Sequence, residues 1–164
     1  MLNVNNINQY YGGSHILRDV SLQTQTGKVT VLLGRNGVGK TTLLKSLMGL
    51  VPIKTGSIEF DGQPIHNATP YERARAGIGF VPQGREIFAR LTVEENLNAV
   101  LEMLPLSRTE KRERLDSLLN ELGIQHVRKI KGYALSGGES RRAEIARALV
   151  LEPAIMLLDE PFAG

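Results

Sequence analysis

The sequence predicts an α/β fold in which a mainly parallel sheet carries helices, and three observations lead to this class. A glycine-rich motif stands between an apolar, β-branched stretch and a helix-forming stretch within residues 29–50. A second apolar stretch, residues 154–158, ends in two acidic side chains. Residues 92–130 instead carry apolar side chains at helical spacing. Strand patterns that alternate with helix patterns are typical of parallel sheets, so we expect an α/β core with a helical insertion.

The first part of the chain predicts two half-buried strands. Residues 2–7 and 17–23 alternate apolar and polar side chains, which is the pattern of a strand with one face on a core. A turn at residues 10–14 separates them. Further short strands, each followed by a turn signal, are predicted at residues 57–60 and 78–81.

Residues 34–41, Gly-Arg-Asn-Gly-Val-Gly-Lys-Thr, have the G-x-x-x-x-G-K-[ST] spacing of a phosphate-binding loop. Residues 29–33, Val-Thr-Val-Leu-Leu, predict a buried parallel strand before this loop, and residues 42–50 predict a helix after it. The backbone N–H groups at a helix N-terminus converge on one point, where the helix dipole adds positive charge. A glycine-rich turn with an incidental lysine is the alternative, and the strand and helix on either side favour nucleotide binding.

Each residue type in this loop has a predicted task. Glycines let the backbone close around phosphates, the Lys40 ammonium reaches the terminal phosphates, and the Thr41 hydroxyl holds Mg²⁺. The predicted phosphate-binding residues are Gly34, Asn36, Gly37, Gly39, Lys40, Thr41 and Thr42.

Residues 154–158 predict a buried strand that leads into Asp159 and Glu160, which is a Walker B pattern. Ligands bind at the carboxyl ends of parallel strands, so we expect these acids to converge with the phosphate loop. Asp159 is predicted to hold Mg²⁺, directly or through a water, and Glu160 to polarise the water that attacks the γ-phosphate. Alone, an acidic pair after a strand is more often an ordinary loop start; beside a phosphate loop it favours catalysis.

Residues 92–130 predict a helical subdomain. A capping box at residues 92–95 opens one helix, and leucines at helical spacing follow a charged run at residues 108–114 that is typical of a solvated helix face. We therefore predict a single domain. Its α/β core comprises residues 1–91 and 152–164, and its helical subdomain, with the motif at residues 135–139, comprises about 92–151.

Composition excludes several classes of protein. The 164 residues carry a net charge of +3, and the basic side chains are scattered among acidic ones, which gives no argument for nucleic-acid binding. The absence of cysteine excludes a disulfide framework and a cysteine metal site. No apolar run approaches the roughly 20 residues of a membrane span.

Residues 135–139, Leu-Ser-Gly-Gly-Glu, open a predicted helix over 140–151 and form a second anion-binding helix N-terminus. One bound ATP does not need two such cradles from one protomer, so we expect the second to serve a facing copy. In this feature the chain resembles the ATP-binding subunits of ABC transporters, whose signature is LSGGQ. The resemblance covers the whole chain, in family order from Tyr11 through the phosphate loop and Gln83 to the signature and Walker B strand. It implies a P-loop NTPase fold, with a RecA-like core, N-terminal antiparallel strands and an inserted helical subdomain.

The resemblance also implies roles for individual residues, with ATP and Mg²⁺ as cofactors. Tyr11 would stack on adenine, with Tyr10 as a competing choice, and Gln83 would contact Mg²⁺ and the attacking water while sensing the membrane partner. The signature residues predicted to bind the ATP of the opposite subunit are Ser136, Gly137 and Gly138. The predicted catalytic residues are Lys40, Gln83 and Glu160, and the predicted metal ligands are Thr41, Gln83 and Asp159.

Two features depart from the family pattern. Glu139 replaces the usual Gln at the end of the signature, and we expect its carboxylate to point outward or to cap its own helix. The chain also stops at residues 161–164, inside a loop that in the family continues with an Asp, a further strand and a His. None of His15, His66 and His126 is placed to replace that His, so the resemblance implies a C-terminally truncated ATPase without its last strands.

Within the family, the chain looks most similar to the second ATPase subunits of urea and branched-chain amino acid importers. The similar stretches are residues 10–17, 33–40, 81–88 and 91–97, and Gln83 with residues 35–36 favours urea. This resemblance implies permease subunits and a second ATP-binding subunit as partners, with an extracytoplasmic solute-binding protein involved indirectly. It implies a peripheral location on the cytoplasmic face of the membrane. The alternatives are a nucleotide-binding fragment without hydrolysis and a soluble ABC ATPase that acts on DNA or ribosomes.

Overall fold

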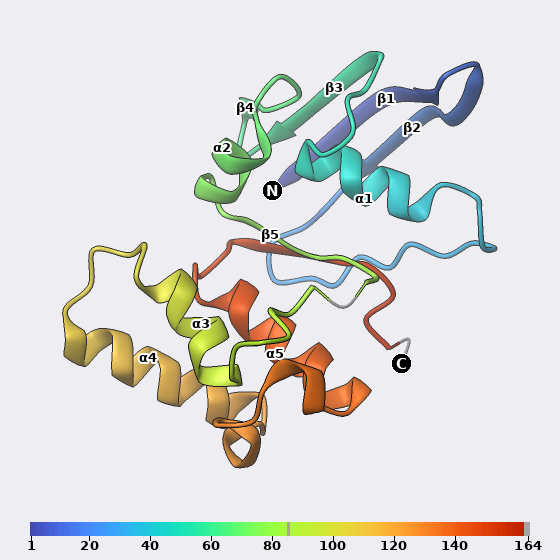
Figure 1. Ribbon diagram of the computed structural model, residues 1–164. Helices are drawn as coiled ribbons and strands as arrows, with labels where there is room; N and C mark the ends of the chain where they lie inside the picture. Colours follow the sequence, from blue (N-terminus) through green and yellow to red (C-terminus); the bar gives the residue numbers. More distant parts are fainter. Residues whose placement is uncertain (85, 163–164) are drawn as a thin grey trace. The chain divides into compact units, whose positions relative to one another are not determined.

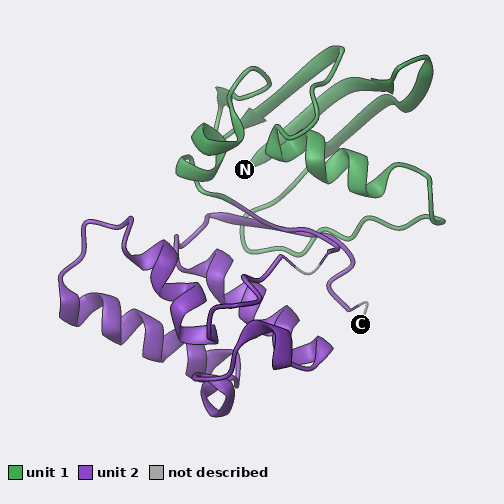
Figure 2. Ribbon diagram, in the orientation of Figure 1, with its two compact units in different colours: residues 1–78 green, residues 79–164 purple. Residues whose placement is uncertain are grey.

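The computed structural model describes residues 1–84 and 86–162, and the chain divides into two compact units (Figures 1 and 2). Unit 1 comprises residues 1–78, and unit 2 comprises residues 79–164. Two parts of the chain lie outside the described residues. They are Arg85, which belongs to one of the stretches that resemble the family, and residues 163–164 at the end of the sequence. Among the described residues, no helix is both long enough and apolar enough to cross a membrane.

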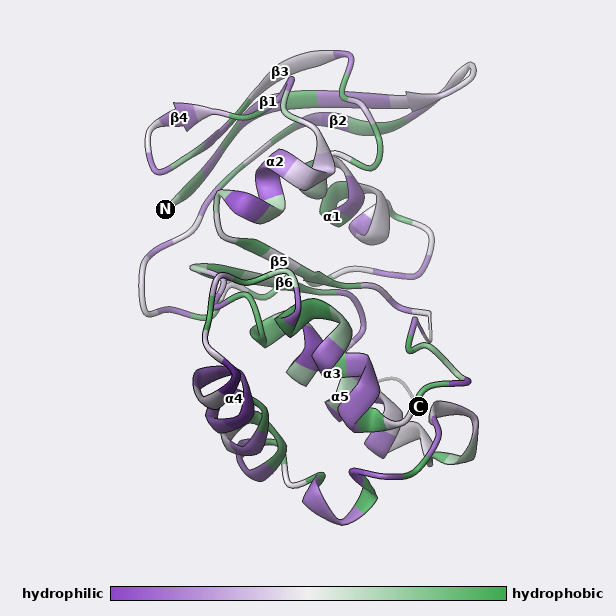
Figure 3. Ribbon diagram, turned by 60° about the vertical axis from the view of Figure 1, so that its left-hand side comes forward, coloured by the Kyte–Doolittle hydropathy of each residue, from purple (hydrophilic) through white to green (hydrophobic). Residues whose placement is uncertain are grey.

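Unit 1 is a four-stranded antiparallel sheet with two helices on one face (Figures 1 and 3). The strands are β1 (Leu2–Tyr11), β2 (Ser14–Gln23), β3 (Thr55–Phe60) and β4 (Gln63–Pro64), in the order β2-β1-β3-β4. The helices are α1 (Lys40–Met48) and α2 (Pro70–Arg75). Val4 of β1 lies opposite Leu22 and Ile58 in its two neighbours. The predicted strands at residues 2–7, 17–23 and 57–60 are confirmed, and each extends further than predicted.

The alternating pattern of β1 produces the core of unit 1. Leu2, Val4 and Ile7 are buried and lie with Ile58 and Phe60 of β3 beneath the sheet. Each such aliphatic side chain contributes roughly 1.5–3 kcal/mol when it is fully removed from water. The intervening polar residues face outward, so a shift of one residue in register would expose the whole set.

The prediction of a strand at residues 29–33 is wrong for this structure. These residues form no strand, and Val29 and Leu33 are 91% and 89% exposed. A parallel strand obtains its backbone hydrogen bonds from strands on its two sides. In the described part of unit 1, no strand pairs with this segment, and the strand order runs β2-β1-β3-β4 without it. The apolar, β-branched composition of residues 29–33 is therefore not sufficient for a strand in this structure.

Unit 2 combines a two-stranded sheet with a bundle of helices. The strands are β5 (Ile78–Val81), which begins at the last residue of unit 1, and β6 (Ile155–Leu158). The helices are α3 (Val93–Leu101), α4 (Arg108–Glu121) and α5 (Gly137–Leu149), with short 3₁₀ turns η1 (Gln125–Val127) and η2 (Gly132–Ala134). The predicted strands at 78–81 and 154–158 and the predicted helices are thereby confirmed to within a few residues.

The ends of β5 and β6 bring two predicted site segments together. The Asp159 amide, directly after β6, donates to the Val81 carbonyl at the end of β5 at 3.0 Å. The carboxyl ends of both strands thus lie at one edge, as in parallel pairing. A Cβ on Gly79 of β5 would lie 2.4 Å from the Met156 sulfur of β6, so a side chain there would push the strands apart.

The helices of unit 2 share one apolar core. α3 and α4 begin at capping boxes, in which Thr92 pairs with Glu95 and Ser107 with Glu110. α4 is mainly hydrophilic in Figure 3, and its buried leucines lie on one side. The buried apolar residues of this core are Val93, Leu97, Leu101, Leu115, Leu118, Leu119, Ile124, Val127, Leu135, Ala143, Ala146 and Val150. They fall within the predicted helical subdomain, whose boundaries at about 92 and 151 stay a prediction.

Candidate functional site

The predicted site residues fall into two groups, one in each unit. Unit 1 carries the phosphate loop and Tyr11, and unit 2 carries Gln83, the signature loop and the two acids after β6. In the second group the structure joins Gln83 directly to Glu160. The signature loop opens α5. On the second turn of this helix, Arg141 donates hydrogen bonds to the carbonyls of Pro82 and Asp159, the residues that precede Gln83 and Glu160.

The phosphate loop leads directly into α1. Gly39 is the N-cap of this helix, with φ of 101°, a conformation that disfavours any residue with a Cβ. A Cβ at Gly39 would also lie 3.1 Å from Leu17 and 3.2 Å from Ile16 of β2. Two independent constraints therefore require glycine at the point where the loop becomes a helix.

Lys40 lies back across this loop. Its Nζ donates to the Gly34 carbonyl at 2.8 Å and to the Arg35 carbonyl at 2.9 Å. The first turn of α1 contains no acidic side chain, so the ammonium and the helix N-terminus place positive charge at the loop without local compensation. The loop suits the triphosphate of ATP, because amides, dipole and ammonium all favour an anion there.

The remaining residues of the loop differ in exposure. Gly34, Asn36 and Gly37 are exposed, and Thr41 is half-buried at the start of α1. Thr42 is buried on the inner side of the helix, so its backbone amide is the group that remains suited to a phosphate.

The two adjacent tyrosines of β1 differ in environment. The Tyr10 ring stacks on His15 with 4.1 Å between centroids, and Lys54 Nζ lies 4.8 Å from the same ring. Tyr11 is 49% exposed at the end of the strand. Since Tyr10 is already engaged, Tyr11 is the better suited of the two for stacking on a base.

In unit 2, Gln83 and Glu160 form a hydrogen-bonded pair. Gln83 Nε2 donates to Glu160 Oε2 at 2.7 Å, although the residues are 77 positions apart. Glu160 has a φ of 45°, which is uncommon for a residue with a side chain and persists only when the surroundings hold it. The amide keeps the carboxylate directed at one place, as a water-polarising group requires.

Asp159 fits a metal ion. The residue is 2% exposed, and its Oδ2 atom is buried without a hydrogen-bond partner. A buried carboxylate oxygen without a partner is costly, and a cation would satisfy it. Carboxylate oxygens are among the ligands that Mg²⁺ prefers, so Asp159 fits its predicted metal role. Thr41 and Gln83 stay predicted ligands.

The signature loop is organised around Ser136, the N-cap of α5. The Glu139 carboxylate accepts from the Ser136 amide at 2.8 Å and from its hydroxyl at 2.6 Å. His126 Nε2 lies 3.2 Å from the other Glu139 oxygen. The prediction that Glu139 caps its own helix is confirmed. Among the described residues, and apart from its own helix backbone and chain neighbours, nothing lies within 4 Å of the position of a Cβ on Gly138, so that side of the loop is open.

These contacts lower the pKa of Glu139 from 4.5 to about 2, chiefly through the hydrogen bonds from Ser136 and then through His126. The carboxylate therefore stabilises the start of α5 above about pH 5, and this contribution is lost as the pH falls toward 2. We expect Ser136→Ala to raise the Glu139 pKa strongly toward 4.5 and His126→Ala to raise it less. Carboxyl ¹³C NMR titration measures both changes, and a wild-type pKa near 4.5 would contradict the assignment.

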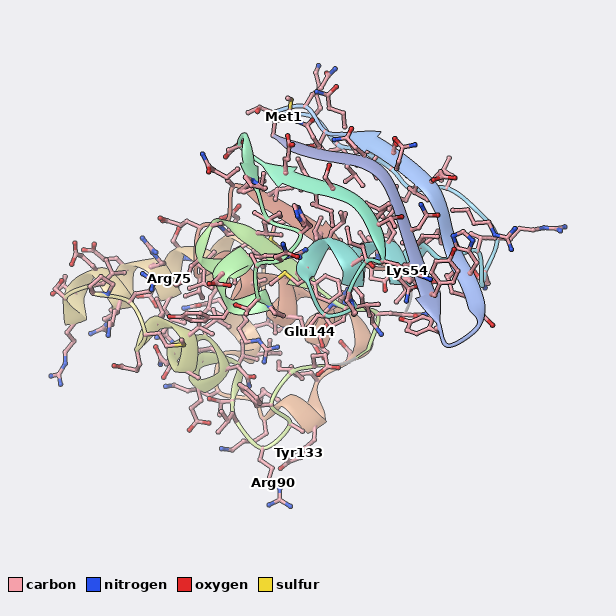
Figure 4. The ribbon with its side chains drawn as sticks, turned by 90° about the horizontal axis from the view of Figure 1, so that it is seen from above. Met1, Lys54, Arg75, Arg90, Tyr133 and Glu144 are labelled. Atoms are coloured by element: carbon pink, nitrogen blue, oxygen red, sulfur yellow. The ribbon has the colours of Figure 1, made fainter. Side chains whose placement is uncertain are left out.

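Sequence reasoning missed two residues of this region, Arg141 and Glu144 of α5. Arg141 donates to the carbonyls of Pro82 and Asp159, and Glu144 accepts from the Glu86 amide. Glu144 is surrounded by other side chains, whereas Arg90 and Tyr133 project outward (Figure 4). The only sequence signal was an acid three residues after a base on a helix, which is common on exposed helix faces.

Comparisons with known proteins agree with the motifs. A family model described as "ABC transporter" matches residues 17–163. A "Probable ABC transporter ATP-binding protein" of Azorhizobium caulinodans is 53% identical over 94% of the chain, which spans 55% of that relative's length. The lipopolysaccharide export system ATP-binding protein LptB of Haemophilus influenzae is 47% identical over 100% of the chain and 68% of its own length. The chain thus spans little more than half the length of the first of these relatives.

Solved structures show the same fold. The structure of cbiO1 from Clostridium perfringens, part of the cbiONQ ABC transporter complex, has a TM-score of 0.88 at 35% identity. The similarity covers 99% of this chain and 66% of the cbiO1 chain. A dimeric ATP-binding cassette in a post-hydrolysis state, bound to ADP and Pi, has a TM-score of 0.87 at 28% identity, with 99% and 75% covered. The predicted fold class, a P-loop NTPase with antiparallel N-terminal strands and helical insertions, is confirmed.

Proposed function

Because the chain belongs to the ABC transporter family, we propose that it is the ATP-binding and ATP-hydrolysing part of a subunit that energises a membrane transporter. The observation that carries this proposal is the phosphate loop. Its lysine ammonium lies over the loop carbonyls, and α1 begins at the loop without an acidic side chain in its first turn. This combination favours a polyphosphate over other ligands.

Hydrolysis in this proposal depends on positioning and charge. Lys40 and the loop amides hold the phosphates, and Tyr11 stacks on the base. Glu160, directed by Gln83 at 2.7 Å, accepts a proton from the water that attacks the γ-phosphate. Thr41, Gln83 and Asp159 are the proposed ligands of Mg²⁺, which would neutralise charge on the phosphates when bound.

The signature loop is proposed to bind the ATP of a second ATP-binding subunit, through Ser136, Gly137 and Gly138. Two observations support this role. The open side of Gly138 lets a ligand approach the backbone, and the Glu139 carboxylate is held by its own helix cap. The dimer bound to ADP and Pi among similar solved structures agrees with a two-subunit arrangement. The subunit pair would act on permease subunits at the cytoplasmic face of the membrane.

Two kinds of transported solute compete. The residue resemblance favours import of a small polar solute, with urea first and branched-chain amino acids next, and such importers use an extracytoplasmic solute-binding protein. Relatives of the chain instead include LptB proteins, named for lipopolysaccharide export, at 45–49% identity. Purified urea-importer and lipopolysaccharide-exporter permease subunits would decide the system. The cognate permease should retain the chain and change its rate of phosphate release, and binding to neither would contradict both systems.

Binding of Mg-ATP to the purified chain tests the nucleotide site. We expect Lys40→Ala to weaken affinity by about 10- to 100-fold, since a charge-assisted hydrogen bond contributes about 1.5–3 kcal/mol. Lys45→Ala, on the last turn of the same helix, is the matched control and should change affinity less than about twofold. Isothermal titration calorimetry measures both. Equal affinity for Lys40→Ala and wild type would overturn the proposed site.

Two assays test the two remaining alternatives, phosphate release for the first and retention on nucleic acid for the second. Mg-dependent release by the chain would exclude the reading as a nucleotide-binding fragment without hydrolysis. Retention on DNA or ribosomes at moderate salt, without retention by a permease, would favour the soluble ABC ATPase.

A further inference from the structure

Arg141, one turn into α5, joins two segments that lie far from it in the sequence. Its Nη1 donates to the Pro82 carbonyl at 2.6 Å, and its Nη2 donates to the Asp159 carbonyl at 2.5 Å. The side chain is 12% exposed. The planar guanidinium presents donors in a fixed fork, so one rigid group sets the separation of the two carbonyls.

Glu144 holds this guanidinium and adds a second connection. Its Oε2 atom lies 3.3 Å from Arg141 Nη1, and its Oε1 atom accepts from the Glu86 amide at 2.6 Å. The Glu144 side chain is 3% exposed. A buried carboxylate requires such partners, so the same face of α5 is tied both to the segment around Gln83 and to the end of β6.

The two carbonyls that Arg141 binds belong to the peptides that lead into Gln83 and Glu160. A peptide group is planar, so fixing the Pro82 carbonyl also fixes the orientation of the Gln83 amide, and the Asp159 carbonyl does the same for Glu160. Gln83 and Glu160 then meet at 2.7 Å. The φ of 45° at Glu160 needs such external support.

We propose that Arg141 is a positioning residue that couples the signature helix α5 to the Gln83–Glu160 pair. A displacement of α5 is transmitted through one guanidinium to both peptides, and so to the direction of the Glu160 carboxylate. The coupling gives the signature end of the helix a route to the hydrolytic group of its own chain. The catalytic consequence rests on the proposed function, because Glu160 and Gln83 have their roles there.

The test compares Arg141→Lys with Arg142→Lys. Lysine keeps the charge but loses the fork, and Arg142 is the exposed next residue of the same helix. The first readout is the side-chain amide resonance of Gln83, assigned by its loss in Gln83→Glu. In the wild type and in Arg142→Lys, adding Glu160→Ala should shift this resonance, because Gln83 Nε2 donates to the Glu160 carboxylate. In Arg141→Lys the same added change should shift the resonance at least threefold less.

The second readout is steady-state hydrolysis of Mg-ATP. Arg141→Lys should lower kcat at least tenfold with KM changed less than twofold, whereas a merely structural role would alter both or neither. A Gln83 resonance that responds to Glu160→Ala equally in Arg141→Lys and in the wild type would overturn the coupling. Absence of turnover in the wild type would count against the proposed function alone, because the resonance is measured without hydrolysis.

A measurement on the unmodified chain covers the case in which Arg141→Lys does not fold. The Arg141 guanidinium protons of the wild type should exchange with water at least tenfold more slowly than those of Arg142. Equal exchange rates for the two side chains would overturn the proposed coupling whatever the variant does.

Discussion

Replacing Glu160 with Gln is expected to lower the rate of phosphate release from Mg-ATP by about 10²- to 10⁴-fold, which is the usual contribution of a general base. Gln has nearly the same shape and can keep a hydrogen bond to Gln83 after the amide turns, but it does not accept a proton from water. Nucleotide affinity should stay within about twofold of wild type, because Lys40 and the loop amides are unchanged.

The matched control for this variant is Glu152→Gln. Glu152 also has a positive φ, 48°, and pairs with Arg114 at the surface at 2.8 Å. Exposed ion pairs contribute little, so this change should leave turnover within about twofold. A Glu160→Gln chain that hydrolyses ATP at the wild-type rate would remove Glu160 from the mechanism.

The largest expected effect on stability is that of Arg73→Met in unit 1. Arg73 is 2% exposed, and its guanidinium donates to the carbonyls of Ala68, Ser46, Leu47 and His66 at 2.7–3.0 Å. Burial lowers the pKa of this guanidinium below its ordinary value, so the four carbonyls compensate only in part for the removal of its charge from water. Met fills similar space but provides no donor to these carbonyls. The Ser46 carbonyl keeps the bond from the Gly49 amide at 3.1 Å, and each acceptor left unpaired costs roughly 1–3 kcal/mol before relaxation.

We expect Arg73→Met to lower the free energy of opening of α1 by about 3 kcal/mol, as measured by native-state hydrogen exchange in low urea. Arg75→Met is the control on the same helix, because Arg75 is exposed and, among the described residues, its guanidinium makes a hydrogen bond and a cation–π contact with the Tyr71 side chain alone. That change should cost less than about 0.5 kcal/mol. If Arg73→Met lowers the free energy of opening of α1 by less than about 1 kcal/mol, water hydrogen-bonds the freed carbonyls and the guanidinium contributes little to stability.

Arg73 also matters for the proposed site. It binds the last carbonyls of α1, where the helix dipole favours positive charge. The first turn of the same helix carries Lys40 and Thr41. A weakened attachment of α1 should therefore reduce Mg-ATP affinity, although Arg73 itself lies at the opposite end of the helix.

Local patterns predicted most of the elements. Alternation in residues 2–7 was sufficient for β1, because a strand with one buried face has period two wherever it lies. The capping box at Thr92 and Glu95 gave the start of α3, because both partners lie within one turn. A third such pair, Thr69 and Glu72, opens α2, a helix that we did not predict although the same signal was present.

The prediction failed where an element depends on a distant partner. Residues 29–33 have the composition of a buried strand, yet Val29 and Leu33 are exposed, because a strand also needs neighbouring strands. The first register shift of β1 against β2 falls between Val4 and Ile7, where the consecutive polar residues Asn5 and Asn6 interrupt the alternation. We did not interpret this interruption as a bulge.

The sequence by itself determined the phosphate loop, the signature and the acids after β6. Each of these motifs is a run of contiguous residues, and its chemistry follows from the backbone and side chains of that run alone. Only the tertiary structure decided that Gln83 meets Glu160 and that Arg141 joins Pro82 to Asp159. It also decided that Arg73 donates to a carbonyl at the C-terminal end of α1. These contacts link residues 18 to 77 positions apart, and the path of the chain, which no local pattern encodes, brings them together.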